Sequence, residues 1–372
     1  MPSRFCERCE RITHDGHLWC PEKDCPAEDG FPLFEYGDYV GDLKVTKGVR
    51  VWRTAALYEA ERGGQPVLLK VAHSGMECEE RLKREALLLE ALRDKAKPAS
   101  GFLPARRPIR LQLLPPYPTP SKRPYGEITI RGEPKIYCVY KHIAGRVLSD
   151  LLLESPHLWH YEAAWIAATL AKALQPLAAR SKLHLSLTPD MVMVEQDADG
   201  HWRPTLLDLG WVLSGAEAAG QPGVPPRLEP AYTAPEVFSG RPEAFTPAAD
   251  VYALGMIFYE ILAGHPGFEA KLWRDEKVRQ AVAQRREALP VERPELERAG
   301  VVKIVQQALA PTGRYTTVQE FARAIEAVYA APPPERRPYP RRMYVLLGML
   351  GTLLGAVLCA SVFLLLRLWL SS

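Results

Sequence analysis

Residues 250–268 read DVYALGMIFYEILAGHPGF, and this stretch decides the fold. It opens a region, from about residue 246 to 330, in which the apolar residues recur mostly at helical spacing. The part of the chain before this region reads as strands with one early helix among them. Strands followed by helices predict an α+β body of two lobes, over about residues 38–330.

The first part of the body is predicted to hold a hairpin. Residues 51–60 (VWRTAALYEA) and 66–72 (PVLLKVA) are separated by ERGGQ, a short glycine-containing connection that suits two paired strands. Further on, residues 136–143 (IYCVYKHI) read as another strand. Residues 159–180 read as a long helix that Pro176 is expected to bend or interrupt near its end.

The early helix carries an unexpected carboxylate. In ERLKREALLLEAL, the positions Leu82, Glu85, Leu89 and Leu92 step by three, four and three, so they share one helix face. Glu85 therefore lies on the apolar stripe of an otherwise charged helix. A carboxylate in that position needs a partner.

Six features in a fixed order resemble those of protein kinases, and the similarity covers about 290 residues. They are Lys70 in PVLLK, which resembles the strand-3 lysine; Glu85, the helix-C glutamate; residues 184–191 (HLSLTPDM), which stand where His-Arg-Asp-Leu-Lys-Pro-x-Asn belongs; Asp208-Leu209-Gly210, similar to Asp-Phe-Gly; Ala234-Pro235-Glu236; and Arg314, placed where kinases keep the arginine that pairs with that glutamate. Residues 250–268 resemble the large central kinase helix. The resemblance implies a bilobal protein-kinase-like fold.

The catalytic positions depart from the kinase pattern. In an active kinase, the catalytic-loop aspartate accepts the substrate hydroxyl proton, and an asparagine five residues later holds a second magnesium. Here these positions are Ser186 and Met191. A neutral serine hydroxyl cannot take a proton without a base of its own, and a thioether is a poor ligand for magnesium. Thr188 replaces the loop lysine, and of the phosphate-covering glycines only Gly48 remains.

Part of a nucleotide site remains in Lys70, Glu85 and Asp208. The resemblance implies that Lys70, paired with Glu85, positions a phosphate and that Asp208 supplies one carboxylate to magnesium. In the alternative, the ion pair only braces the small lobe. ATP and magnesium are thus candidate cofactors, with both alternatives open. The resemblance also makes Asp250 and His184 supports of the catalytic-loop backbone.

A cysteine-rich head occupies residues 1–30. Its predicted zinc ligands are Cys6, Cys9, Cys20 and Cys25. The spacing CxxC followed by Cx4C can place four thiolates around one structural zinc in a segment too short for its own core. This resembles a zinc ribbon, although the second knuckle is wider than usual and His14 or His17 could replace a cysteine. A redox pair of the first two cysteines, or uncommitted thiols, are the alternatives.

The charge balance disfavours nucleic acid as a partner. Lys plus Arg number 47 and Asp plus Glu 44, so the net charge of +3 provides no global field for a phosphate backbone. In the head, Phe5, Trp19 and Phe31, with few basic residues, favour a protein contact or docking onto the kinase-like body. Protein partners are therefore expected, and nucleic acid is not.

The C-terminal segment is predicted to be a membrane anchor. Residues 343–366 contain no charge, and a helix of about 20 residues crosses the hydrocarbon core. A buried core helix is the alternative, but the segment has no polar face. The Pro/Arg linker, residues 331–342, holds four arginines near the span, and only Arg367 follows it, which predicts a cytoplasmic body and a single-pass anchor. The spacing of Gly351 and Gly355 could let two such helices form a homodimer.

Together these features predict a membrane-anchored pseudokinase, a scaffold or regulatory module that binds nucleotide at most and is not an enzyme. An atypical active Ser/Thr protein kinase that recruits another carboxylate, such as Asp190, is the first alternative. The second is a structural subunit of a membrane complex that has lost nucleotide binding. ATP with magnesium would stabilise the body in the first two cases and not in the third.

Overall fold

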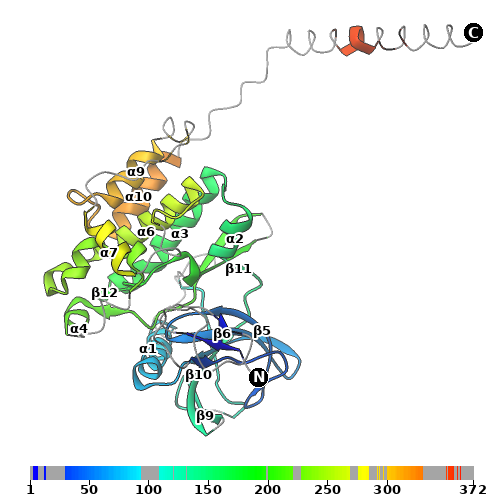
Figure 1. The fold of residues 1–372 in the computed structure, drawn as a ribbon, viewed down its shortest axis with the longest axis vertical. Helices are drawn as coiled ribbons and strands as arrows, with labels where there is room; N and C mark the ends of the chain where they lie inside the picture. Colours follow the sequence, from blue (N-terminus) through cyan, green and yellow to red (C-terminus); the bar gives the residue numbers. More distant parts are fainter. Residues whose placement is uncertain are drawn as a thin grey trace, which may run out of the picture. The chain divides into compact units, whose positions relative to one another are not determined.

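The structure is a computed structural model that describes residues 3–6, 12–13, 30–93, 109–119, 121–130, 132–197, 200–220, 228–268, 275–284, 291, 293, 296, 300–329, 349, 351–355, 358 and 361. The chain divides into two compact units, Met1–Val328 and Tyr329–Ser372. In the first unit, strands with one helix precede a mostly helical part (Figure 1). This confirms the predicted α+β class.

The small lobe is built on a seven-stranded antiparallel sheet. Its strands are β4 (Tyr39–Val40), β5 (Leu43–Val51), β6 (Ala55–Arg62), β7 (Gln65–Ala72), β8 (Leu113–Leu114), β9 (Gly126–Ile130) and β10 (Glu133–Lys141), in the order β4-β5-β6-β7-β10-β8, with β9 paired to β10. Helix α1 (Met76–Arg93) packs against β7 and β10. The sheet and α1 together position the first half of the site.

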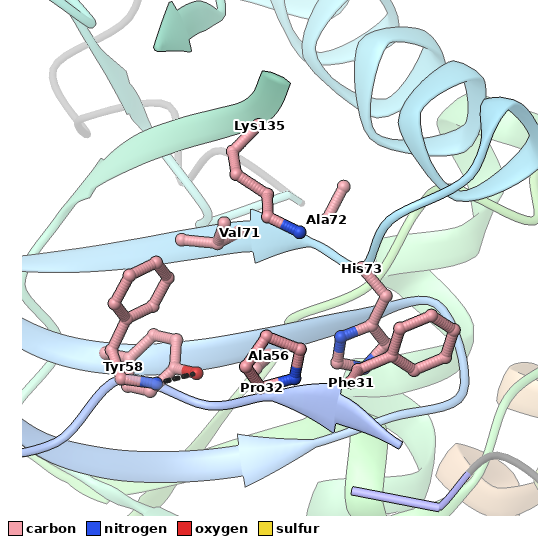
Figure 2. Close-up of a pocket in the computed structure, with 9 residues that line it drawn as sticks. Phe31, Pro32, Ala56, Tyr58, Val71, Ala72, His73 and Lys135 are labelled. Carbon is pink, nitrogen blue, oxygen red and sulfur yellow. Dashed lines mark hydrogen bonds between the residues drawn. The ribbon is translucent and has the colours of Figure 1, made fainter. Parts of the chain in front are cut away.

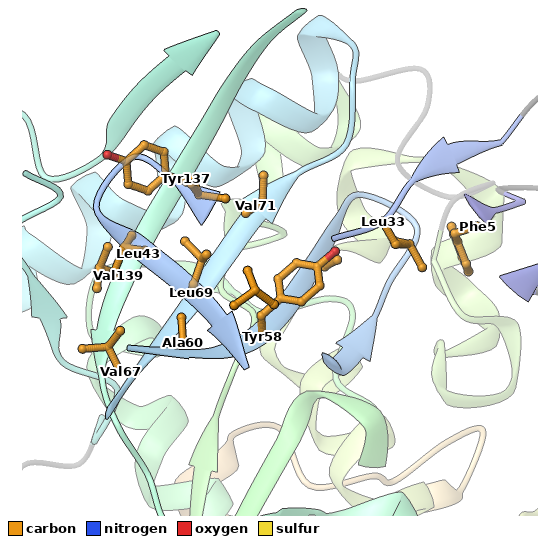
Figure 3. Close-up of a cluster of buried hydrophobic side chains, with 13 residues drawn as sticks. Phe5, Leu33, Leu43, Tyr58, Ala60, Val67, Leu69, Val71, Tyr137 and Val139 are labelled. Atoms are coloured by element: carbon orange, nitrogen blue, oxygen red, sulfur yellow. The ribbon is translucent and has the colours of Figure 1, made fainter. Parts of the chain in front are cut away.

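The two faces of this sheet have different roles. Residues two apart on a strand point to the same face, and Val67, Leu69 and Val71 of β7 join one apolar cluster with residues of β5, β6 and β10 (Figure 3). Lys70 therefore points to the other face. Because α1 packs against β7, that face brings Lys70 toward Glu85.

The prediction of one strand over residues 51–60 is wrong at its start. Strand β5 ends at Val51 and β6 begins at Ala55, and residues 52–54 form the turn between them, closed by a hydrogen bond from Trp52 N to Ala55 O of 2.8 Å. Trp52 lies in the turn but is buried, at 7% exposed, so it looks like a residue of the strand that follows. Burial of a turn residue has no periodic signature.

The large lobe contains most of the helices. They are α2 (Leu148–Glu154), α3 (His160–Ala178), α4 (Gly215–Ala219), α6 (Pro247–Ala263), α7 (Asp275–Gln284), α9 (Val301–Leu309) and α10 (Val318–Tyr329), with short 3-10 turns η1 (Pro189–Met191), η2 (Pro230–Tyr232), η3 (Pro235–Ser239) and η4 (Pro242–Ala244). Two small sheets, β11-β13-β14 and β12-β15, complete it: β11 (Arg146–Val147), β12 (Lys182–Leu183), β13 (Val192–Gln196), β14 (Trp202–Leu206) and β15 (Leu213–Ser214). The end of β14 and the loop before η1 carry the second half of the site.

Helix α6 is the buried centre of the large lobe. Pro247 lies in its first turn, where a missing N–H costs no intrahelical bond. Gly264 ends it in the left-handed region with φ 80°. It packs against α3 and α9, and α3 continues past Pro176 to Ala178, so the expected interruption comes two residues after the proline.

The described residues of the head, together with Phe31–Pro32, which follow it and are counted with it below, form a three-stranded sheet in the order β2-β1-β3, with β1 (Arg4–Phe5), β2 (Ile12–Thr13) and β3 (Phe31–Pro32). Cys6 is buried beside β1. Cys9, Cys20 and Cys25 lie outside the described residues. Among the side chains that the structure describes, no group of three or more metal-ligating residues gathers, so the zinc site stays a prediction.

The predicted span, residues 343–366, lies mostly outside the described residues. Those that are described, Met349, Gly351 to Gly355, Leu358 and Ser361, are helical. Within the described part of the chain, no helix has the length and apolar character that a membrane crossing requires. The anchor, the position of the body in the cytoplasm and the pairing of Gly351 with Gly355 of a second copy stay predictions.

Candidate functional site

Lys70 of β7, Glu85 of α1 and Asp208, two residues after β14, meet in one buried cluster. Nζ of Lys70 lies 2.6 Å from Oε2 of Glu85 and 2.8 Å from Oδ1 of Asp208. Their exposed fractions are 2%, 0% and 2%. The structure thus brings together the three residues that the sequence assigned to a nucleotide site, and Lys70 is the partner that Glu85 needs.

Burial and mutual charge set the protonation of this cluster. Burial alone would lower the pKa of Lys70, but the charges of Asp208 and Glu85 outweigh it and the pKa is raised. Burial would raise the pKa of Asp208, yet the charge of Lys70 and hydrogen bonds from its surroundings hold that pKa well below its usual range. For Glu85, burial outweighs the attraction of Lys70 and raises the pKa to about 7. The cluster keeps Lys70 and Asp208 charged, while Glu85 titrates near neutral pH.

Glu85 also fixes the segment that carries Asp208. Its Oε2 accepts a hydrogen bond of 3.0 Å from Leu209 N. Its Oε1 accepts one from the hydroxyl of Tyr140, a fully buried residue of β10. Each hydrogen bond to a buried carboxylate lowers the free-energy cost of removing it from water. Helix α1 is therefore tied through Glu85 to both β10 and the Asp208-Leu209-Gly210 segment.

Asp208 has one carboxylate oxygen to spare. Its Oδ1 accepts from Lys70 and, at 3.1 Å, from Gly210 N. Its Oδ2 is buried and has no hydrogen-bond partner. An ionised carboxylate oxygen without a donor is a ligand that magnesium prefers. Oδ2 of Asp208 can therefore supply one oxygen ligand to a divalent cation.

The catalytic loop offers neither a base nor a second oxygen ligand. Ser186 is 4% exposed and Met191 is 7% exposed. The hydroxyl of Ser186 contacts the thioether sulfur of Met191 at 3.8 Å. A hydroxyl facing a thioether can accept no proton at neutral pH and presents no ligand to a hard cation.

Asp190 is held by neighbouring side chains. Its Oδ1 accepts a hydrogen bond of 2.6 Å from Ser149 and lies 3.2 Å from a guanidinium nitrogen of Arg50. Arg50 also pairs with Asp150, the residue after Ser149, at 2.5 Å. The carboxylate that could replace the missing base is thus part of an ion-pair network between β5 and α2.

Two further contacts implied by the sequence are present in the large lobe. Asp250 accepts hydrogen bonds from the backbone N–H groups of His184, at 2.9 Å, and Leu185, at 3.0 Å. These bonds support Leu185 at φ 65°, a conformation that is strained for a branched side chain. Arg314 lies 2.6 Å from Glu236. The scaffold of the loop is therefore complete although its reactive groups are missing.

Sequence reasoning missed Trp52, which covers the cluster. The indole ring centroid lies 5.0 Å from Nζ of Lys70, and the indole N–H donates to the carbonyl of Asp190 at 3.3 Å. An ammonium over an indole face is attracted to it. The only sequence sign was a tryptophan in the segment between Gly48 and Gly63, where the kinase pattern has small residues.

The large cavity of the structure lies elsewhere. It measures about 670 Å³ and is lined by the C-terminal end of α1, by residues 109–124 and by the end of α3. Lys70, Glu85, Asp208 and Trp52 do not line it. The low exposure of Lys70, Glu85 and Asp208 shows that the cluster is covered rather than open.

Comparison with known proteins gives consistent results. The family model described as "Protein kinase domain" matches residues 127–323. The chain is 35% identical over 146 residues to Serine/threonine-protein kinase PkaA of Streptomyces coelicolor, covering 38% of this chain and 25% of that protein. It is 26% identical over 261 residues to Serine/threonine-protein kinase PknB of Mycobacterium leprae, covering 68% of this chain and 40% of that protein.

The same fold is found in a solved structure. A crystal structure of a double mutant of the Mycobacterium tuberculosis PknI kinase domain matches with a TM-score of 0.53 and 20% identity, covering 80% of this chain and 99% of that one. The chain covers well under half of the length of both PkaA and PknB.

Proposed function

We propose that this chain, which belongs to the protein kinase family, acts as a membrane-anchored pseudokinase, a scaffold or regulatory module that binds protein partners and does not transfer phosphate. The observation that carries this proposal is the buried contact between Ser186 and Met191. It replaces both the base and the second magnesium ligand that phosphoryl transfer uses. Phosphotransfer with radiolabelled ATP is the test.

Nucleotide binding without turnover is supported by the remaining cluster. Lys70 would hold a phosphate, with Glu85 orienting its ammonium group, and Asp208 would hold one magnesium through its unpartnered Oδ2. Bound magnesium would neutralise phosphate charge. In the structure, the Lys70 ammonium group and the Asp208 carboxylate lie 2.8 Å apart in a buried site.

An active Ser/Thr protein kinase is the second candidate, favoured by the similarity of the chain to the serine/threonine-protein kinases PkaA and PknB. In this candidate Asp190 accepts the substrate proton. Arg50 and Ser149 already hold its Oδ1. A variant that breaks that hold, Arg50→Gln, would raise the activity of such an enzyme and leave a pseudokinase inactive.

We expect the apolar segment to hold the protein on membranes through high salt and alkaline wash, and truncation before Met343 to release it. The uncharged stretch of residues 343–366 is long enough to cross the hydrocarbon core, and a crossing helix is not removed by screening charge. Membrane sedimentation of both forms measures this. Release of the full-length protein by carbonate would contradict the anchor.

We expect one zinc ion per chain, held by Cys6, Cys9, Cys20 and Cys25. A head of about 30 residues that cannot build its own core gains its stability from metal ligation. Elemental analysis of reduced, freshly purified protein measures the zinc. Full zinc retention after the combined change Cys6→Ser and Cys25→Ser would contradict this ligand set.

A further inference from the structure

We infer that the N-terminal head controls the access of nucleotide to Lys70, because docking of Phe31 on His73 holds Trp52 over the ammonium group. This inference rests on the nucleotide site proposed above. It adds a regulatory element, the head, to that site. The elements involved are β3, the residue after β7, and the turn between β5 and β6.

Lys70 has no donor left for a phosphate. Its three N–H groups face Oε2 of Glu85 at 2.6 Å, Oδ1 of Asp208 at 2.8 Å and the carbonyl of Leu207 at 3.3 Å. The indole of Trp52 covers the ammonium, and both side chains are buried. A phosphate oxygen must approach Nζ to about 3 Å. Trp52 must therefore move, and a phosphate oxygen must take the place of the Leu207 carbonyl at 3.3 Å, before a phosphate can bind.

His73 fixes the turn that carries Trp52. Its backbone N–H donates to the carbonyl of Thr54 at 3.0 Å, and its Nε2 lies 2.8 Å from the carbonyl of Trp52. Because the partner is a carbonyl, Nε2 carries the proton and donates. Burial lowers the pKa of His73 to about 4, so the ring is neutral at pH 7. One residue thus holds two carbonyl groups of the 52–54 turn.

The head holds His73 in place. The ring of Phe31 stacks on the imidazole with centroids 4.5 Å apart and an interplanar angle of 3° (Figure 2). Phe5, the partner of Phe31 across the β1–β3 pair, lies nearly parallel to the same ring at 5.6 Å. The cavity beside these rings measures about 10 Å³, which leaves room for one water at most. The contact between head and small lobe is therefore closely packed.

The large lobe holds the turn from the other side. Arg53 donates to Asp275 of α7 at 3.0 Å, and the indole N–H of Trp52 donates to the carbonyl of Asp190. Two independent sets of contacts thus keep Trp52 in place. The contacts from the head can be removed by substitution without changing Lys70, Glu85 or Asp208.

The test is the affinity of the full-length protein in detergent for the fluorescent nucleotide MANT-ATP with magnesium. If the nucleotide-competent form is a minor population of 10% or less, releasing Trp52 tightens binding by about ten-fold or more. We expect the full gain for Trp52→Leu and a smaller gain for Phe31→Leu, because the contacts of the turn with the large lobe remain in that variant. The double variant should gain little beyond Trp52→Leu, because both changes act on the same contact.

Phe34→Leu is the matched control. Phe34 lies on the same N-terminal segment and packs edge-on against Tyr58, with centroids 5.7 Å apart, and not on His73. It should leave nucleotide affinity unchanged. An equal gain in Phe34→Leu, or no gain in Phe31→Leu where Trp52→Leu gains, would overturn the role of the head.

The rate of amide hydrogen exchange in residues 43–62 tests the role of the head independently of whether the protein binds nucleotide. If no variant binds MANT-ATP, the proposed nucleotide site fails. Faster exchange of this hairpin in Phe31→Leu, but not in Phe34→Leu, would still support the control of Trp52 by the head. Unchanged exchange in both would overturn it.

Discussion

Replacement of Lys70 by methionine is expected to cost about 3–5 kcal/mol of folding free energy. The substitution keeps most of the side-chain volume but leaves Glu85 and Asp208 together in a site with 0% and 2% exposure. Removing one partner of a buried ion pair leaves an uncompensated charge, which costs this much in other proteins. For a body of this size the melting temperature should fall by about 10 °C. Thermal unfolding of the full-length protein in detergent measures it.

The pH dependence of this loss identifies its cause. A carboxyl whose folded-state pKa lies above its unfolded value stabilises the fold below the unfolded pKa and loses that contribution as the pH rises through the folded pKa. Burial already raises the pKa of Glu85 to about 7, and the loss of the Lys70 charge raises it further. Below about pH 7 Glu85 is protonated in both folded proteins, so its contribution to the deficit of Lys70→Met stays constant there; the deficit should grow as the pH is raised above about 7.

Lys182→Met is the control for the loss of a surface lysine. Lys182 and Glu217 form an ion pair in which the side chains are 30% and 49% exposed. Such a pair contributes about 1 kcal/mol at most. If Lys70→Met is as stable as Lys182→Met, the buried cluster does not stabilise the small lobe.

The fold could be predicted from the sequence where a segment was almost entirely apolar or had a clear helical spacing of its apolar residues. The buried helix at residues 250–268 appeared as a nearly uninterrupted apolar run, and the glutamate on the stripe of α1 indicated a buried partner. Strand β5 was missed except at its end. Only its first residues, Leu43 and Val45, enter the core, and the rest is partly exposed. A strand with so few buried positions has no clear alternation.

The charge pairs of the site could be predicted from the sequence, whereas the side chain that covers them could not. Lys70, Glu85 and Asp208 have one function each in the kinase pattern, so their positions could be transferred. Trp52 acquires its role from His73 and Asp190, and the latter is 138 residues away in the chain. No local pattern encodes such a contact. The aromatic residues of the head did indicate docking onto the body, and Phe5 and Phe31 pack there.

Phosphoryl transfer is expected to be absent from the purified protein, even if it binds ATP. Loss of a general base alone typically forfeits about 10² to 10⁴ in rate. Here the second magnesium ligand and all but one of the phosphate-covering glycines are missing as well. These losses act on one transition state and need not multiply. Compensation by Asp190 would have to come from a carboxylate whose Oδ1 is already held by Ser149, at 2.6 Å, and by Arg50, at 3.2 Å.

A complementary experiment restores the two kinase residues that the loop lacks. Ser186→Asp combined with Met191→Asn returns a carboxylate and an amide oxygen to the positions where kinases use them. The rest of the loop scaffold, held by Asp250, is already in place. We expect this double variant to transfer more phosphate than the wild type, to itself or to a generic protein substrate.

The central claim is tested most directly by transfer of radiolabelled phosphate from ATP with magnesium, comparing the wild type with Asp208→Asn. The substitution keeps the shape of the side chain while removing the charge that would hold magnesium. We predict that the wild type shows no transfer above that of Asp208→Asn. Transfer by the wild type that Asp208→Asn abolishes would contradict the pseudokinase assignment and establish the chain as an active kinase.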